Sequence, residues 1–138
     1  MKQYFDITEF IIDPAATVIP IQVVQKIDAF HKPVLHDIRR VLGVPVIISK
    51  YSGYRTIDWE KSRGRDGTSQ HTFQGKGAVD VRSNKRFEQL LELLIHSAYM
   101  RVCYYPCLGH IHCDYASSTK QYFVADRNKS WHFKRYRN

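Results

Sequence analysis

The order of the patterned segments restricts the fold of this chain more than any other feature of its sequence. The first patterned segment is a long amphipathic helix, predicted after Pro20 because apolar residues recur there every three or four positions. Gly43 and Pro45 end this helix, and Pro33 is expected to kink it. The apolar positions that define its buried face are Val23, Ile27, Phe30, Val34, Ile38 and Val41.

The rest of the chain is patterned mainly as strands. The β-branched run 44–48 predicts a short buried strand, and the polar, glycine-bearing stretch 56–77 predicts a long loop of the kind that carries function. A second amphipathic helix, from Phe87 to about Tyr99, is expected among short strands at 78–81, 101–104, 110–115 and 122–125. Because this order is not regular βαβ alternation, we predict an α+β fold with a small, mainly antiparallel sheet and helices packed on one side.

Composition limits the size and the partners of the protein. The 138 residues, 43% of them hydrophobic, suffice for a single domain spanning 1–138 and its core. The net charge of +8 leaves nucleic acid, anionic cell-wall polymer and acidic membrane surfaces open as partners. Much of this charge falls in a basic C-terminal tail, about 127–138, which holds five of the 21 Lys and Arg residues and no acid.

Targeting and redox features are few. The sequence contains no uncharged apolar run of about 18 residues, so no membrane-spanning helix is predicted. Acids at Asp6, Glu9 and Asp13 interrupt any apolar region of a signal peptide, and we therefore expect synthesis in the cytoplasm. The three cysteines all lie within 103–113 and are odd in number, which favours reduced thiols over a disulfide scaffold.

Side chains capable of chemistry concentrate in two segments, SQHTFQGKGAVD and GHIHCDY. Alternate residues of a strand point the same way, so His110, His112 and Asp114 are expected to share one face. Imidazoles combined with carboxylates suit Zn²⁺, which in catalytic sites takes three protein ligands and keeps a fourth position for water. His71, Asp80 and His112 would make such a set.

Other interpretations of these residues stay open at this point. A zinc knuckle could use Cys103, Cys107, His110 and Cys113, but the spacing matches no common pattern, and buried ordinary thiols are the alternative. Isolated histidines are usually surface or core residues, as we expect for His31, His36, His96 and His132. The two tryptophans, Trp59 and Trp131, are expected to bury area rather than to stack on a substrate.

Three ordered blocks resemble a known family. They are VLGVPVIISKYSGYRT, GTSQHTFQGKGAVDVRS and MRVCYYPCLGHIHCDYAS, within about residues 34–131. The chain resembles the zinc D-alanyl-D-alanine carboxypeptidase and L-alanyl-D-glutamate endopeptidase family. That family shares its zinc-site architecture with lysostaphin-type peptidases and the hedgehog signalling domain, and GHIHCD is very similar to the hedgehog version of the last block. Three blocks in order are far more specific than any one of them.

The resemblance implies roles for individual residues. His71, Asp80 and His112 match the family's zinc ligands. Arg55, in SGYRT, matches an arginine that contacts carboxylate or carbonyl oxygens of the substrate, a task that suits a guanidinium group. Ser69 is expected to line the substrate cleft.

Two departures from the family pattern bear on activity. His71 and Asp80 are nine residues apart, about two more than in the family's motif, and Gly75 with Gly77 is expected to let the extra residues bulge. The catalytic acid that many members carry three or four residues before the last histidine is replaced by Gly109 and Leu108. The candidates left for the general base are His110 and Asp114; Asp114 could instead orient a histidine or pair with Arg101.

Three functions follow as hypotheses. The first is a zinc metallopeptidase that hydrolyses peptide bonds of bacterial peptidoglycan, of the carboxypeptidase or endopeptidase type. Such a protein would fit a phage-type lysis function, made in the cytoplasm and then released to the cell wall or carried in a virion. The second is a metal-binding module of the same fold without turnover, binding cell wall or protein. The third, resting on the basic tail, is a nucleic-acid binder.

Overall fold

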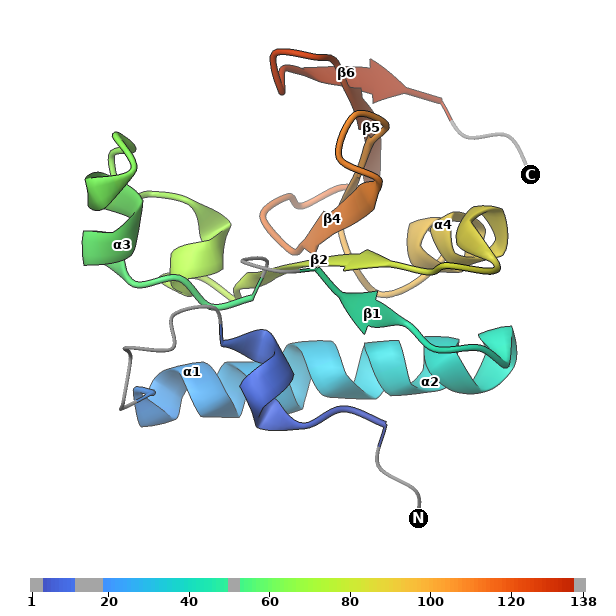
Figure 1. Cartoon of the computed structure of the whole chain (residues 1–138), viewed down its shortest axis with the longest axis horizontal. Coiled ribbons are helices and arrows are strands. Elements are labelled where there is room, and N and C mark those ends of the chain that lie inside the picture. The colour runs from blue at the N-terminus through green and yellow to red at the C-terminus, as the bar shows by residue number, and fades with distance from the viewer. Residues whose placement is uncertain (1–3, 12–18, 50–52, 136–138) are drawn as a thin grey trace.

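The computed structural model describes residues 4–11, 19–49 and 53–135 (Figure 1). A six-stranded sheet, ordered β1-β2-β4-β3-β5-β6, forms its centre, and every strand pair is antiparallel except β3 with β5. The helical elements are η1 (Ile7–Phe10), α1 (Ile21–Lys26), the π-helical turn η2 (Ile27–His31), α2 (Lys32–Leu42), α3 (Ile57–Ser62), η3 (Gln70–Thr72) and α4 (Phe87–Ile95). The strands are β1 (Ile47–Ile48), β2 (Ala78–Arg82), β3 (Arg101–Tyr105), β4 (His110–Asp114), β5 (Gln121–Ala125) and β6 (Trp131–Lys134). The predicted α+β class with a mainly antiparallel sheet is therefore confirmed.

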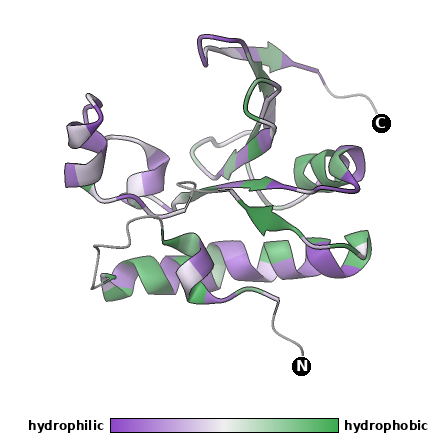
Figure 2. Cartoon of the chain, viewed as in Figure 1, coloured by the Kyte–Doolittle hydropathy of each residue, from purple (hydrophilic) through white to green (hydrophobic). Residues whose placement is uncertain are grey.

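One face of the sheet forms the hydrophobic core with the helices. Strand residues Val79, Val81 and Ile111 pack there with Leu35 of α2 and Leu90 of α4, all of them buried. Figure 2 shows hydrophobic residues striped along these helices and concentrated on β1. Because side chains alternate along a strand, the neighbours of the core residues point to the opposite face of the sheet.

Strand register places the polar residues of that opposite face in one row. Asp80 of β2 pairs with His112 of β4, and His112 pairs with Cys103 of β3. The row continues through Phe123 of β5 to Phe133 of β6. The predicted alternation within β4 is confirmed, because Ile111 and Cys113 lie in the core while His112 does not.

The first long helix differs from its prediction in which residues it buries. Val41 is 62% exposed, whereas His31, Leu35 and Leu42 are buried. The cause is the π-helical turn η2, whose wider turn shifts the buried face of everything that follows it. Pro33 comes just after this turn, inside the continuous helical segment formed by α1, η2 and α2, where its ring nitrogen cannot donate a backbone hydrogen bond.

Four further elements depart from the sequence-based prediction. The predicted loop 56–77 contains the helix α3, which begins where the Thr56 hydroxyl accepts a hydrogen bond from the Trp59 N–H. The predicted strand 44–48 is limited to β1, and α4 ends at Ile95 rather than near Tyr99. The basic tail contains the unpredicted strand β6, while residues 136–138 lie outside the described part of the chain, as does Asp13.

His31 is a core residue, as its isolation in the sequence suggests. Its ring is fully buried, Nδ1 lies 2.9 Å from the Tyr99 hydroxyl, and Nε2 lies 2.9 Å from the carbonyl oxygen of Lys76. Burial lowers its pKa to about 4, so the ring is neutral at neutral pH. None of the helices within 4–11, 19–49 and 53–135 combines the length and apolarity needed to span a bilayer.

Candidate metal centre

Three side chains from separate elements converge on the face of the sheet away from the core. His71 comes from η3, Asp80 from β2 and His112 from β4. The Asp80 Oδ1 atom lies 2.9 Å from His112 Nδ1 and 3.3 Å from His71 Nε2, and these two nitrogens are 3.2 Å apart. These are the residues that the family resemblance assigns to a metal, and within the described residues they form a group able to hold one ion.

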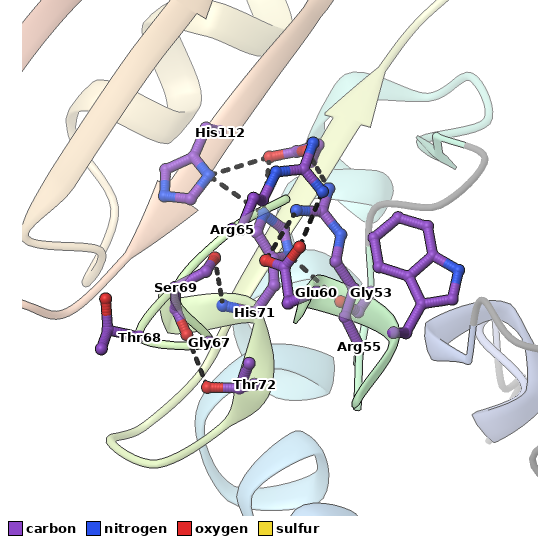
Figure 3. Close-up of polar contacts among 12 residues, drawn as sticks. Gly53, Arg55, Glu60, Arg65, Gly67, Thr68, Ser69, His71, Thr72 and His112 are labelled. Carbon is purple, nitrogen blue, oxygen red and sulfur yellow. Dashed lines mark hydrogen bonds and ion pairs between the residues drawn. The ribbon is translucent and has the colours of Figure 1, made fainter. Parts of the chain in front are cut away.

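The local backbone fixes each of these ligands. The hydroxyl of Ser69 accepts a hydrogen bond from the His71 N–H and so caps the turn η3 (Figure 3). Gly53 approaches so closely that a Cβ there would lie 2.1 Å from the Phe10 carbonyl oxygen, and its own carbonyl meets the His71 ring. Asp80 and His112 face each other because β2 and β4 pair in that register.

Hydrogen bonds on the outer side of each imidazole determine which nitrogen faces the group. His71 donates from Nδ1 to the Gly53 carbonyl at 3.0 Å, which leaves Nε2 as an acceptor. His112 donates from Nε2 to the Asp114 carboxylate at 2.6 Å, which directs Nδ1 inward. Two imidazole nitrogens and a carboxylate oxygen are typical ligands of Zn²⁺, and outer carboxylate or carbonyl partners are typical of metal-binding histidines. The donor set therefore fits a zinc ion.

The electrostatics of the group favour a cation. Burial would raise the pKa of Asp80, but the facing His71 and His112 lower it well below its usual range. Burial would lower the pKa of His112, and its hydrogen bonds to Asp114 and Asp80 reverse this and raise the pKa to about 9. The two carboxylates thus strongly favour positive charge at the His112 ring, which a proton on Nδ1 or a metal ion bound to Nδ1 can supply.

Asp114 contacts the Nε2 side of the His112 ring, whereas Asp80 contacts the Nδ1 side. The Asp114 carboxylate has no exposed surface and accepts two hydrogen bonds from Arg101, at 2.8 and 2.6 Å, besides the one from His112. The Ala116 N–H donates a further bond at 2.9 Å. Burial would raise the pKa of Asp114, but these hydrogen bonds hold it far below the usual range. Both alternatives to a catalytic role are thus observed, since Asp114 orients a histidine and pairs with Arg101.

The longer spacing between His71 and Asp80 is absorbed by the segment that joins them. Phe73 adopts a left-handed conformation, with φ 59°, and Gly77 has φ 90°. A Cβ at Gly77 would lie 2.2 Å from the Phe73 ring, so glycine is required there for space as well as for conformation. Gly75 contributes no positive φ, so only Gly77 fulfils the expected role.

A cleft of about 360 Å³ opens over the three ligands. His110 lines it with a side chain that is 15% exposed, and His110 Nε2 lies 3.7 Å from Asp80 Oδ2. Burial lowers the pKa of His110. Arg55 and Ser69 line the same cleft, whereas Asp114 is not among its lining residues. Of the two predicted candidates for the base, only His110 therefore has access to the cleft.

Arg55 is held by a buried carboxylate that the sequence analysis missed. Glu60 of α3 has no exposed surface and lies 3.6 Å from Arg55 and 2.7 Å from Arg65 (Figure 3). Arg55 also lies 3.7 Å from Asp80, which connects it to the ligand group. A six-residue helix inside a polar stretch gives no periodic signal, so nothing in the sequence marked Glu60 as buried.

The cysteines do not form the alternative zinc knuckle. Cys103 pairs with His112 across the sheet and faces the ligand side, whereas Cys113 faces the core. Cys107 is exposed in the turn between β3 and β4. Strand alternation thus separates the thiols, and all three are free.

One aromatic residue and one lysine of the cleft, Trp131 and Lys129, were not predicted as functional. Trp131 of β6, Tyr105 of β3 and Lys129 in the turn before β6 all line it. The Trp131 Nε1 donates to the Tyr105 hydroxyl at 2.5 Å, and its ring centroid lies 5.1 Å from that of His112. The Trp131 ring thus packs against His112, as expected for a residue that buries area, and it also lines the cleft.

A His–Asp–His group and an arginine in one cleft, on a mainly antiparallel sheet, form an arrangement that suits a metal-dependent hydrolase. Comparison with protein families agrees, because the sequence model described as Peptidase M15 matches residues 4–114. The chain belongs to the Peptidase M15 family, whose members are metal-dependent peptidases. A search of curated proteins found no match.

Proposed function

We propose that this protein is a zinc-dependent peptidase that hydrolyses peptide bonds of bacterial peptidoglycan, of the D-Ala-D-Ala carboxypeptidase or L-Ala-D-Glu endopeptidase type. The observation that supports it most is the convergence of two inward-facing imidazole nitrogens and a carboxylate oxygen beneath a cleft. Membership of a peptidase family supports a peptide substrate. The peptidoglycan assignment rests on the resemblance of the three sequence blocks.

His71, Asp80 and His112 would hold the zinc ion. When bound, zinc supplies Lewis acidity, which polarises the scissile carbonyl and makes water a better nucleophile near neutral pH. The contribution of the chain is to hold three ligands rigidly, because each of them is buried and at least one outer hydrogen bond fixes each imidazole.

His110 is our assignment for the general base. Its ring lines the cleft beside Asp80, and burial keeps the imidazole neutral and able to accept a proton at neutral pH. The same group can then return this proton to the leaving amine. Asp114 is assigned a positioning role, since its oxygens are occupied by His112, Arg101 and Ala116.

Arg55 is assigned to the substrate. Its side chain is 15% exposed in the cleft, and two carboxylates, Glu60 and Asp80, hold it in place. A guanidinium fixed in this way can donate to a carbonyl or carboxylate oxygen of a peptide without first losing conformational freedom. Ser69 lines the same wall, while its hydroxyl caps the turn that carries His71.

A metal-binding module without turnover is the second candidate. Leu108 and Gly109 stand where many family members carry a catalytic acid, and this observation favours it. On either assignment the protein is expected to act at the cell wall after release from the cytoplasm or from a virion.

The test is to incubate zinc-loaded protein with purified peptidoglycan and to measure new amino groups and released amino acids. We expect release by the wild type and loss of at least roughly 100-fold in rate in His110→Ala with zinc retained, as for removal of a general base. Zinc binding without any release, beside an active control hydrolase, would favour the binding module instead.

A further inference from the structure

The C-terminal hairpin contributes to the cleft although it lies outside the family-matched residues. The match ends at Asp114, whereas the hairpin consists of β5 and β6, joined by the turn 126–130. In Figure 1 this hairpin stands beyond β4 at one end of the sheet. Lys129 and Trp131 of the hairpin nonetheless line the cleft together with the candidate metal ligands. One part of the cleft is thus built from residues outside the family match.

Trp131 anchors the hairpin against the site. Its ring centroid lies 5.1 Å from those of His112 and Phe123, and the Arg101 guanidinium lies 4.8 Å from it. Its indole N–H donates to the Tyr105 hydroxyl. Contacts on several sides hold this partly buried ring in one orientation, and they fix the turn that immediately precedes it.

Lys129 occupies a backbone conformation that favours glycine. Its φ is 64°, in the left-handed region, and its N–H donates to the Asp126 carbonyl. The Asp126 carboxylate accepts hydrogen bonds from the Asn128 and Ser130 N–H groups, which close the turn. A lysine in this conformation is strained relative to glycine, so the turn itself gives no reason for its side chain.

Charge pairing singles out Lys129 among the cations that line the cleft. Arg55 and Arg65 are paired with Glu60, and Arg101 with Asp114. Within residues 4–11, 19–49 and 53–135, no carboxylate lies within ion-pair distance of the exposed Lys129 ammonium. Lys129 therefore presents positive charge that the surrounding protein does not neutralise.

We propose that Lys129, held at the cleft by the Trp131 anchor, is a specificity-determining residue that binds a carboxylate of the peptide substrate. The proposal rests on the proposed function for the substrate class, and it adds that negative charge at one position of the peptide is selected by the hairpin. Arg55 and Lys129 then contact different parts of one substrate.

The test uses three synthetic peptides and measures binding and turnover separately. The parent is L-Ala-γ-D-Glu-L-Lys-D-Ala-D-Ala; one derivative has its D-Glu α-carboxylate amidated, and the other its C-terminal carboxylate. Each is titrated into zinc-loaded wild type, Lys129→Gly and Arg127→Ala. Glycine suits the left-handed turn, so Lys129→Gly removes the ammonium without disturbing the fold. Arg127→Ala removes a charge from the same turn, away from the cleft, and is the matched control.

For one of the two amidations we expect weaker binding to the wild type and to Arg127→Ala, by roughly three- to tenfold, the range of a partly exposed ion pair. In Lys129→Gly the same amidation should change affinity less than about twofold, because the partner of the carboxylate is gone. Trp131→Phe, with zinc content measured beside it, should reduce this discrimination only in part.

The proposal is overturned if Lys129→Gly discriminates between the peptides as strongly as the wild type, or if no peptide binds to any variant. Hydrolysis of the peptides without charge discrimination would overturn the role of Lys129 and leave the peptidase function intact. Lys129-dependent discrimination in binding without hydrolysis would support the role of Lys129 and contradict the peptidase function.

Discussion

The central strands and the C-terminal hairpin meet in one cleft but are built in different ways. On β2 and β4, Asp80, His112 and Asp114 are buried, and hydrogen bonds join His112 to both carboxylates. On the hairpin, Lys129 and Phe133 are exposed, and Trp131 connects that end of the sheet to the site through its contacts with Tyr105 and His112. Buried, mutually bonded groups suit metal binding, which needs fixed geometry, whereas exposed groups suit recognition.

The central strands β2 and β4 and the hairpin also differ in whether the family model covers them. The three candidate ligands lie within the matched residues 4–114, and the hairpin lies beyond them. Changes to the central strands should therefore abolish metal binding or activity, while changes to the hairpin should alter substrate preference.

The largest effect is expected for Asp80→Asn. The amide keeps the size of the side chain but removes the charge that faces both histidines, so zinc affinity should fall by more than about 100-fold, and activity with it. Metal titration monitored by a chromophoric chelator measures this. Full zinc affinity in the variant would show that Asp80 is not a ligand.

A second large effect concerns stability and pH. His31 has a folded pKa of about 4 against an ordinary 6.5, so the unfolded chain binds its proton more tightly and stability falls as pH drops below 6.5. Between pH 7 and pH 5 this one residue should cost about 2 kcal/mol of unfolding free energy. Denaturant titrations at both pH values, compared with His31→Gln, isolate the effect. An equal loss of unfolding free energy in His31→Gln would show that other groups cause the pH dependence.

Asp114→Asn tests positioning within the central strands. The amide retains a partner for His112 but weakens the bond that directs Nδ1 inward, and we expect roughly a 10- to 100-fold loss of zinc affinity or activity. Activity should follow zinc affinity, with the pH profile of the zinc-saturated enzyme unchanged. Loss of one limb of this pH–activity profile in the variant would instead indicate that Asp114 is the general base.

The smallest effect is expected on the hairpin. Phe133 is 60% exposed and lies several strands away from His112 in the same cross-strand row. Phe133→Ala should therefore change the unfolding free energy by less than about 0.5 kcal/mol. Zinc affinity should stay the same. A marked loss of zinc would show that the hairpin supports the metal site and that the division between the two regions is wrong.

Local patterns were sufficient to predict much of the fold. Period-two alternation placed His110, His112 and Asp114 on β4 with Ile111 and Cys113 toward the core, as observed. Helical periodicity located α2 but misplaced its buried face, since a π-helical turn is invisible to a pattern of fixed period. The short elements α3 and β6 were missed because each has too few residues to show a period.

The candidate site was predictable where it rests on sequence motifs and not where it rests on tertiary contacts. The three ligands stand in recognisable blocks, and the structure brings them together. Glu60 and Trp131 enter the site through the path of the chain, from a helix within a polar stretch and from a strand within a basic tail. No local pattern reports such placement, because it depends on which distant segments pack together.

Metal content, measured by mass spectrometry under native conditions, decides whether His71, Asp80 and His112 form a zinc site. The wild type and Phe133→Ala should each carry one zinc ion per chain, and His71→Ala should carry none while remaining folded, because the ligand set is specific to His71, Asp80 and His112. Absence of zinc from the wild type after exposure to the ion, or the same zinc content in His71→Ala, would show that these three residues do not form a zinc site.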